Sequence, residues 1–383
     1  MLKPYTLWSK RTGPLQKSFI DVFSQLEDPR VERTRLYTVS EILLTTLCGV
    51  IAGCDGWADI ELFAKQRLDF LRQYLPFDNG TPSDDTLRRF FRAVDPQRFQ
   101  TLFAQWVSVS GLNAPGQSHI AIDGKTSRSS ADGAQRALHL VSAYASETRL
   151  VLGQRDVSGK SNEITAIPLL LDLLDLRGST LTLDAMGCQH SIADRIITGG
   201  GHYLIGLKGN QGGVHQDVVT WFERPPREAV IESFTDHDKG HGRLETRQVS
   251  VCDDVQWLHD RHPKWRSIGC IIELNATRQV GERTGSDKRY YIASRSTGVH
   301  HLLGTIRAHW AIENSLHWVL DMSFGEDQSR IRRDNAPANI AVIRHAVLNA
   351  INAVKNKRTS IKQMRKLAGW DQYTLQNILA VLV

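Results

Sequence analysis

The spacing of hydrophobic and polar positions changes along the chain. In the first 115 residues apolar side chains recur three and four positions apart, as in Leu87, Phe90 and Phe91, which is the spacing of one buried helix face. Ser83 before this stretch, and Ser40 before "EILLTTLCGVIAG", are the expected helix N-caps. The pattern predicts a helical N-terminal region that ends at a linker, "LNAPGQS", whose Pro and Gly favour a loop.

Short strand-like runs follow the linker. "SHIAIDGK", "ALHLVSAYAS" and "TRLVLGQRDV" predict three strands with hairpin-length connections. A helix is then predicted over "SNEITAIPLLLDLLDL", a fourth strand over "STLTLDAMG", a second helix from Gln189 to Thr198, and a fifth strand over "HYLIGLKGN". Three strands followed by helix, strand, helix and strand is the order of an RNase H-like α/β fold.

These changes of pattern divide the chain into five expected segments. Turn-punctuated short strands after the fifth strand predict a β-rich insertion, and the helical pattern resumes from Leu302. The expected segments are a helical, DNA-binding N-terminal domain (1–115), the first part of an RNase H-like core (116–220), the β-rich insertion (221–295), the second part of the core with the helix of Glu313 (296–350), and a basic helical C-terminal segment (351–383).

Composition excludes several classes of protein. The longest apolar run, starting at Ile42, is shorter than the roughly 20 residues that span a bilayer, and the N-terminus lacks the apolar core of a signal peptide. We therefore expect a cytoplasmic protein without a membrane partner. The 5 cysteines include no CxxC pair, which argues against a disulfide framework or structural zinc. A net charge of +6 fits a polyanionic partner but does not identify one.

Two aspartates stand where predicted strands end. Asp123 in "AIDG" follows the first strand and Asp184 in "TLDA" the fourth, and open α/β sheets bind ligands beyond the carboxyl ends of their strands. In an RNase H-like sheet these strands are neighbours, so the carboxylates would repel each other unless a divalent cation lay between them. Mg²⁺ and Mn²⁺ prefer oxygen ligands, and two such ions about 4 Å apart can assist phosphodiester cleavage.

A third carboxylate is expected from a helix after the fifth strand. Glu313 is the candidate, although each of the three acids alone has an ordinary structural explanation: a turn for the aspartates and an exposed helix position for the glutamate. The acids Asp321, Glu326 and Asp327 follow closely and are alternatives for the third ligand.

The segment "HWAIENSLHW" around Glu313 leaves alternatives open. His309, Glu313 and His317 recur every four residues, which places them on one face of a regular helix. The imidazoles could orient Glu313, contact phosphate, or bind metal. A single-helix zinc site is disfavoured because the two histidines would lie about 12 Å apart along the axis. Trp310 and Trp318 are more typical of core packing than of base stacking.

Several motifs together resemble a known family. They are "GCDGWADIELFAKQRLDFLRQYLP", "TPSDDTLRRFF", "AIDGKTSRSS", "VSGKSNEITAIPLLLDLLDLRG", "TLDAMGCQ", "LKGNQ", "HGRLETR", "HWAIENSLHWVLDMSFGEDQSRIR" and "NIAVIRHAVLN". They resemble bacterial DDE transposases of the ISAs type, most closely the H-repeat-associated proteins found beside Rhs elements. The resemblance implies an RNase H-like core interrupted by an insertion, with Asp123, Asp184 and Glu313 as catalytic and metal-binding triad.

One signature of related transposases is not met. Relatives with a β insertion carry a Tyr, Arg, Glu, Lys pattern around the third acid, whereas this chain has Ile306, His309 and Leu320 in place of the Tyr, Arg and Lys. The phosphate-contacting roles of that signature are therefore not carried over.

The resemblance implies a Mg²⁺-dependent transposase, with Mn²⁺ able to substitute, that cleaves terminal inverted repeats and transfers the strand to target DNA. Its partner would be double-stranded DNA, bound by a homodimer at the nucleoid. The alternatives are a relic transposase that binds DNA without transposing, and an RNase H-like nuclease.

Side chains at loops, strand ends and basic stretches are the expected DNA contacts. They are Lys160, Asn162, Lys208, Asn210, Arg243, Arg247, His309, His317, Lys355, Lys357 and Arg358. Lys208 is equally well explained as a solvated strand-end lysine, and Arg243 and Arg247 as salt-bridge partners around Glu245.

Overall fold

The N-terminal region is helical, as its spacing predicts. The computed structural model describes residues 17–112, 119–133, 136–157, 162–240 and 242–383. Its first helices are α1 Phe19–Phe23, α2 Val39–Ile51, α3 Trp57–Gln66, α4 Leu68–Leu71, α5 Asp84–Ala93 and α6 Pro96–Val109, with a 3₁₀ turn at Glu32–Thr34.

The helix caps partly match the prediction. Ser83 caps α5, where its Oγ accepts the backbone N–H of Thr86 at 3.3 Å. For α2 the predicted cap is wrong: Thr38 takes the place assigned to Ser40, because Thr38 and Glu41 bond reciprocally to each other's backbone N–H groups in a capping box.

Within the described residues the strands form one sheet. They are β1 His119–Ser127, β2 Leu138–Ala145, β3 Leu150–Asp156, β4 Thr180–Leu183, β5 His202–Leu207, β6 Glu232–Gly240, β7 Arg243–Cys252, β8 Cys270–Val280 and β9 Arg283–Ala293. Their spatial order is β3-β2-β1-β4-β5-β9-β8-β7-β6. The β1–β4 and β4–β5 pairs are parallel, and the other pairs are antiparallel.

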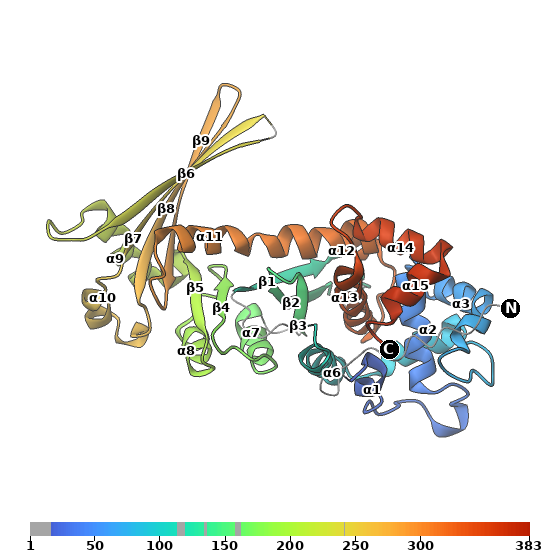
Figure 1. Cartoon of the computed structure of the whole chain (residues 1–383). Coiled ribbons are helices and arrows are strands. Elements are labelled where there is room, and N and C mark those ends of the chain that lie inside the picture. The colour runs from blue at the N-terminus through green and yellow to red at the C-terminus, as the bar shows by residue number, and fades with distance from the viewer. Residues whose placement is uncertain (1–16, 113–118, 134–135, 158–161, 241) are drawn as a thin grey trace.

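Helices cover both faces of the first five strands. The helices α7 Glu163–Leu171 and α8 His190–Thr198 follow β3 and β4, so the predicted order of strands and helices is present. A Cβ on Gly153 of β3 would meet Leu170 of α7 and Ala104 of α6, which puts these two helices on one face. Helix α11 Val299–His309 crosses the opposite face (Figure 1) and contacts β1 and β4.

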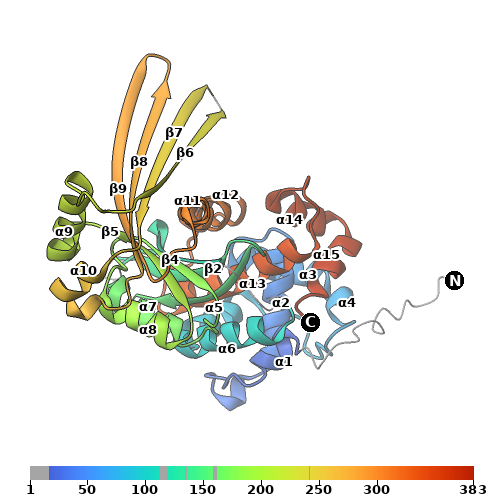
Figure 2. The same ribbon diagram turned by 60° about the vertical axis from the view of Figure 1, so that its left-hand side comes forward.

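The strands β6–β9 extend away from the rest of the molecule as two hairpins (Figures 1 and 2). At their base, apolar residues of β5, β7, β8 and β9 pack against Leu302, Leu303 and Ile306 of α11 in a small core of their own. Helices α9 Gly212–Glu223 and α10 Gln256–Arg261 flank this base. The predicted β-rich stretch is therefore joined to the main sheet through the β5–β9 pair rather than standing apart.

The C-terminal helices complete a bundle with the N-terminal ones. Helix α11 leads through a π-helical turn at Glu313–His317 into α12 Trp318–Phe324, and α13 Ala336–Val354, α14 Ile361–Trp370 and α15 Gln372–Leu379 follow. Buried α13 packs on α2, α5 and α6. Arg365 of α14 is buried, and it donates to the carbonyl of Val50 at 2.9 Å and to the Asp55 carboxylate at 3.1 Å. None of the described helices has the length and apolar character that a bilayer crossing requires.

Helix α13 also closes the edge of the sheet. The amide of buried Asn349 accepts the N–H of Val151 at 2.8 Å and donates to its carbonyl at 2.9 Å. This side chain therefore takes the place of a neighbouring strand for the outer edge of β3.

We predict that Asn349→Ala lowers the free energy of unfolding by about 2–4 kcal/mol, because it leaves a buried N–H and a buried carbonyl of β3 without partners. Chemical denaturation of the full chain measures this. Asn352→Ala is the matched control, because Asn352 lies one turn further along α13 and makes a single bond to Arg149 O at 2.9 Å. Equal losses in the two variants would contradict the role assigned to Asn349.

Candidate functional site

Asp123 and Asp184 lie on adjacent parallel strands. The β1–β4 register ends with Ile122 opposite Leu183, so each aspartate is the next residue on its own strand. β1 does not end at Asp123, as the sequence suggested, but continues to Ser127 because β2 still pairs with it. Asp184 leaves the sheet at once, and its Oδ1 accepts the N–H groups of Met186 at 2.9 Å and Gly187 at 3.2 Å. These bonds fix the carboxylate at the strand end.

Glu313 stands at the start of the π-helical turn. In this turn the N–H of Trp318 donates to the carbonyl of Glu313, five residues back. The expected even row of His309, Glu313 and His317 on a regular helix is therefore wrong, because a π turn widens the spacing around Glu313. Ile312 and Leu316 beside it are buried, and Glu313 itself is exposed.

The three carboxylates line one cleft. Its volume is about 690 Å³, and its walls come from β1, β4, β5, β9, α9 and the segment from α11 to Glu313. Asp123, Asp184 and Glu313 come from three different parts of the chain, and all three line this cleft. The structure thus brings together the acids that the sequence singled out.

Electrostatics couple these acids. Burial raises the pKa of Asp123 to about 7, the Gly124 backbone N–H opposes the rise, and the charges of Asp184, Glu163 and Glu313 add to it. A carboxyl whose pKa is raised by burial and by neighbouring acids favours a bound cation, which would remove both penalties.

The two histidines have different partners. His309 Nδ1 lies 2.9 Å from Thr182 Oγ1, which in turn lies 2.8 Å from His119 Nε2. This chain of hydrogen bonds attaches the end of α11 to β4 and β1. His317 Nδ1 lies 3.7 Å from Asp123 Oδ2. Burial lowers the pKa of His317 to about 4, so this is a polar contact of a neutral imidazole rather than an ion pair.

Gly124 allows the hydrogen-bonded side chains of His139 and Glu163 to lie close to β1 beside Asp123. A Cβ at this position would stand 2.1 Å from Glu163 Oε1 and 2.7 Å from His139 Nε2. These two atoms are themselves 2.7 Å apart, and His139 Nδ1 lies 2.7 Å from Thr126 Oγ1. A side chain at position 124 would therefore displace Glu163 and His139 from their present contact.

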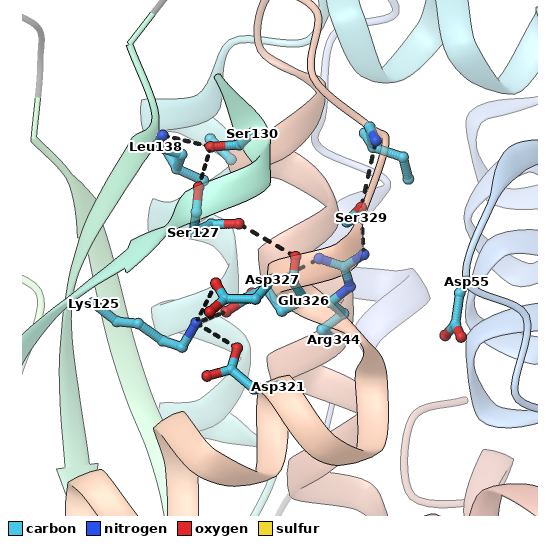
Figure 3. A network of polar contacts seen from close by, with 12 residues as sticks. Asp55, Lys125, Ser127, Ser130, Leu138, Asp321, Glu326, Asp327, Ser329 and Arg344 are labelled. Carbon is cyan, nitrogen blue, oxygen red and sulfur yellow. Dashed lines mark hydrogen bonds and ion pairs between the residues drawn. The ribbon is translucent and has the colours of Figure 1, made fainter. Parts of the chain in front are cut away.

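The alternative third acids are engaged elsewhere. Asp321, Glu326 and Asp327 surround the ammonium group of Lys125, with N–O distances of 2.8, 2.9 and 3.6 Å (Figure 3). None of them lines the cleft of Asp123 and Glu313.

Among the expected DNA contacts, those near the fifth strand lie closest to the acids. Lys208 is exposed and lines the cleft. Asn210 donates through Nδ2 to the carbonyl of Ala185 at 2.6 Å, so it supports the loop after Asp184. Asn162 is exposed before α7. Lys160 lies outside the described residues.

The remaining basic candidates lie away from the cleft lining. Arg243 and Arg247 both pair with Glu245 on β7, the former at 2.9 Å, so the salt-bridge explanation is the one present here. Lys355, Lys357 and Arg358 follow α13; the last two are exposed, and burial lowers the pKa of Lys355.

The insertion supplies cleft residues that the sequence did not reveal. Lys288, Arg289 and Tyr290 of β9 line the same cleft as the acids, because β9 pairs with β5 and places Tyr290 opposite Leu207. The spacing of residues along the chain does not predict that β9 pairs with β5. Trp310 also lines the cleft, with the Arg289 guanidinium 5.4 Å from the centre of its ring. Trp310 and Trp318 are 46% and 60% exposed, so the expected core packing is wrong for both.

The donor set of the cleft suits a hard divalent cation. Three carboxylates supply oxygen ligands only, and burial, with a smaller contribution from the neighbouring acids, raises the pKa of Asp123 to about 7. Within the described part of the chain, no three His, Cys, Asp or Glu side chains lie close enough to surround a single ion. The carboxylates therefore share a cleft without forming a closed ligand shell.

Two family models match most of this chain. A family model described as "Transposase DDE domain" matches residues 114–350, and one described as "DDE_Tnp_1-associated" matches residues 20–107. The chain is 39% identical to "Putative transposase YncI" of Escherichia coli O157:H7 over 95% of both chains. It is 36% identical to "H repeat-associated putative transposase YhhI" of E. coli strain K12, over 95% of this chain and 98% of that one.

Among solved structures, a chain of a piggyBac transposase synaptic complex with hairpin DNA aligns with this protein. The alignment covers 95% of this chain and 81% of the piggyBac chain. The TM-score is 0.43 and the identity 10%. A likeness at that level establishes neither fold nor function.

The pKa of Asp123 predicts a pH-dependent stability. In the unfolded chain this carboxyl ionises near its ordinary value of 3.8, whereas the folded protein holds the proton up to about pH 7. The folded state therefore loses stability relative to the unfolded state as pH rises from about 4 to 7, and the loss is complete above 7. Asp123→Asn removes this penalty. In metal-free buffer we expect it to raise Tm relative to the native chain, and to raise it more at pH 8 than at pH 5.

Asp194→Asn, at an exposed position of α8, serves as the control and should show the same small difference at both pH values. Differential scanning fluorimetry with EDTA measures all three proteins. A smaller gain for Asp123→Asn at pH 8 than at pH 5 would contradict the raised pKa.

Proposed function

Because the chain belongs to the DDE transposase family, we propose that it is a metal-dependent DNA transposase that cleaves the terminal inverted repeats of its element and transfers the freed strand to target DNA. The observation that carries this proposal is the single cleft lined by Asp123, Asp184 and Glu313. These acids come from a central strand, its parallel neighbour and a helix laid across them.

The fold supports the proposal in its topology. The order β3-β2-β1-β4-β5, with β2 antiparallel to both neighbours, fits an RNase H-like core. In this proposal residues 116–220 and 296–350 form the core, 221–295 the insertion, 1–115 a DNA-binding helical domain, and 351–383 a basic C-terminal segment.

Asp123, Asp184 and Glu313 would hold Mg²⁺, or Mn²⁺ in its place. Bound there, two such ions would supply Lewis acidity to the attacking and leaving oxygens of the phosphodiester. The protein's own part is to place three carboxylates along one cleft. The hydrogen bonds from Met186 and Gly187 to Asp184, and the contact of His317 with Asp123, orient two of these ligands.

Cations on the cleft wall would position the DNA backbone. Lys208, Lys288 and Arg289 line the cleft with the acids. Lys288 is 3.1 Å from Glu273, and Arg289 is paired with Asp287; both cations are more than a third exposed, so a phosphate can compete for them. Phosphate contacts of this kind fix register without reading sequence.

Further DNA contacts would lie outside the cleft. Lys357 and Arg358 are exposed after α13, and Lys355 precedes them. Their charge would contribute affinity that falls steeply with salt. A homodimer would bring two element ends together, and the protein would act at the nucleoid, in the cytoplasm.

We predict that Asp123→Ala, Asp184→Ala and Glu313→Ala each reduce Mg²⁺-dependent cleavage of DNA carrying the repeats that flank the coding region. The reduction should be on the order of 10³-fold, because loss of a metal ligand removes several kcal/mol of transition-state stabilisation. DNA affinity in EDTA should change by less than about twofold, since cations outside the acid set supply it. A gel assay of cleaved and strand-transfer products, with a parallel gel shift, measures both.

Asp194→Ala on α8 is the matched acid control and should cleave normally. Undiminished cleavage by Asp123→Ala would overturn the assignment. A native chain that shifts repeat DNA in a salt-sensitive manner but cleaves in neither Mg²⁺ nor Mn²⁺ would instead be a relic transposase. Hydrolysis without any strand-transfer product would identify an RNase H-like nuclease.

A further inference from the structure

Lys125 lies two residues after Asp123 and ends among three carboxylates (Figure 3). Its ammonium nitrogen is 2.8 Å from Asp321 Oδ1, 2.9 Å from Glu326 Oε2 and 3.6 Å from Asp327 Oδ1. The Lys125 side chain is 11% exposed and that of Glu326 is 4% exposed. An ammonium group removed from water this far needs such partners, so the arrangement is specific.

A second buried cation completes the cluster. Arg344 of α13 is 5% exposed and lies 3.8 Å from Glu326 Oε1, and its guanidinium donates to Ser329 Oγ at 3.0 Å. Glu326 therefore stands between a cation from β1 and a cation from α13. Removal of either cation would leave a buried carboxylate with reduced compensation.

Two further hydrogen bonds join β1 to the turn after α12, at the junction formed by Lys125 and its acids. Ser127 Oγ donates to the carbonyl of Glu326 at 3.5 Å, and the N–H of Arg128 donates to Asp327 Oδ1 at 3.2 Å. The 3₁₀ turn Glu326–Gln328 that follows α12 is thus tied to the strand segment that follows Asp123.

The position of this junction relative to the acids is informative. Alternate residues of a strand point to the same face, so Lys125 shares the face of Asp123. Asp321 lies eight residues after Glu313, which is about 12 Å along a helix. On the other side of Glu313, His309 is bonded to Thr182 of β4. The helix that carries Glu313 is therefore attached to the sheet on both sides of that residue.

We propose that Lys125 is a positioning residue for the carboxylate site: it locks the helix carrying Glu313 to the strand carrying Asp123, so that the acids are held ready for a divalent cation. This rests on the proposed function of the cleft. Lys125 lies outside the cleft lining, and it acts through Asp321 and Glu326 rather than on the metal or the DNA.

Lys125→Met in the full chain tests the proposal. It keeps an unbranched side chain one atom shorter and removes the charge. We expect a rise of about tenfold or more in the Mn²⁺ dissociation constant, measured by the electron paramagnetic resonance of free Mn²⁺, since loss of groups that orient metal ligands has this size of effect. The Mn²⁺ concentration for half-maximal cleavage should rise in parallel, while DNA affinity in EDTA stays unchanged.

Two further proteins make the result decisive. Lys65→Met is the matched control, because Lys65 pairs with Glu61 on the surface of α3, and it should behave as the native chain does. If Lys125→Met does not fold, the variant Lys125→Met/Asp321→Asn removes one charge from each side of the Lys125 cluster and leaves Glu326 paired with Arg344. It should fold and still bind Mn²⁺ about tenfold more weakly, because the lock is absent.

The outcomes separate the two proposals. A folded Lys125→Met, or folded double variant, with native Mn²⁺ affinity overturns the positioning role. A lower Tm without any change in Mn²⁺ affinity does so too, because the cluster would then serve stability alone. If the native chain neither binds Mn²⁺ nor cleaves DNA, the proposed function fails and this inference with it.

Discussion

Carboxylates of like charge repel one another. Three of them, Asp123, Asp184 and Glu313, line the same cleft. The effect is visible in Asp123, whose pKa is raised to about 7 by burial and by the neighbouring acids. Such an arrangement persists only where the surrounding structure over-determines it. The parallel β1–β4 pairing fixes the two aspartates side by side. The third acid, Glu313, comes from the helical segment that crosses the sheet.

The helical segment that carries Glu313 is attached to the sheet by several independent contacts. Its apolar face packs on β5 and on the base of the insertion strands, His309 joins it to β4, and Lys125 joins its far end to β1. The π turn lies between these attachments, where Glu313 leaves the regular helix. The insertion therefore contributes to the site twice, as a support for the helix and as a source of cleft residues on β9.

The pattern of residues along the chain predicts those features that depend on contacts within a single helix or strand. The buried face of α5, the strand order through β5 and the two strand-end aspartates were readable because each depends on spacing within one element. The pairing of β9 with β5, which brings Lys288 and Arg289 to the cleft, depends on contacts between segments about 85 residues apart, and no periodicity encodes it. The lysine cluster was missed for the same reason. The π turn is local, but in the sequence the residue spacing around Glu313 is the same as in a regular helix. Asp123 followed by glycine was explained as a turn, and Lys125 two residues on meets its acids only in the folded chain.

The central claim is that these three carboxylates form the metal site. A crystal of the full chain with repeat DNA, grown with Mn²⁺, and its anomalous scattering at the manganese edge would test it most directly. The account predicts manganese peaks within ligand distance of Asp123, Asp184 and Glu313, at about 2.0–2.6 Å for oxygen ligands. Manganese bound instead among Asp321, Glu326 and Asp327, with the cleft left empty, would contradict it.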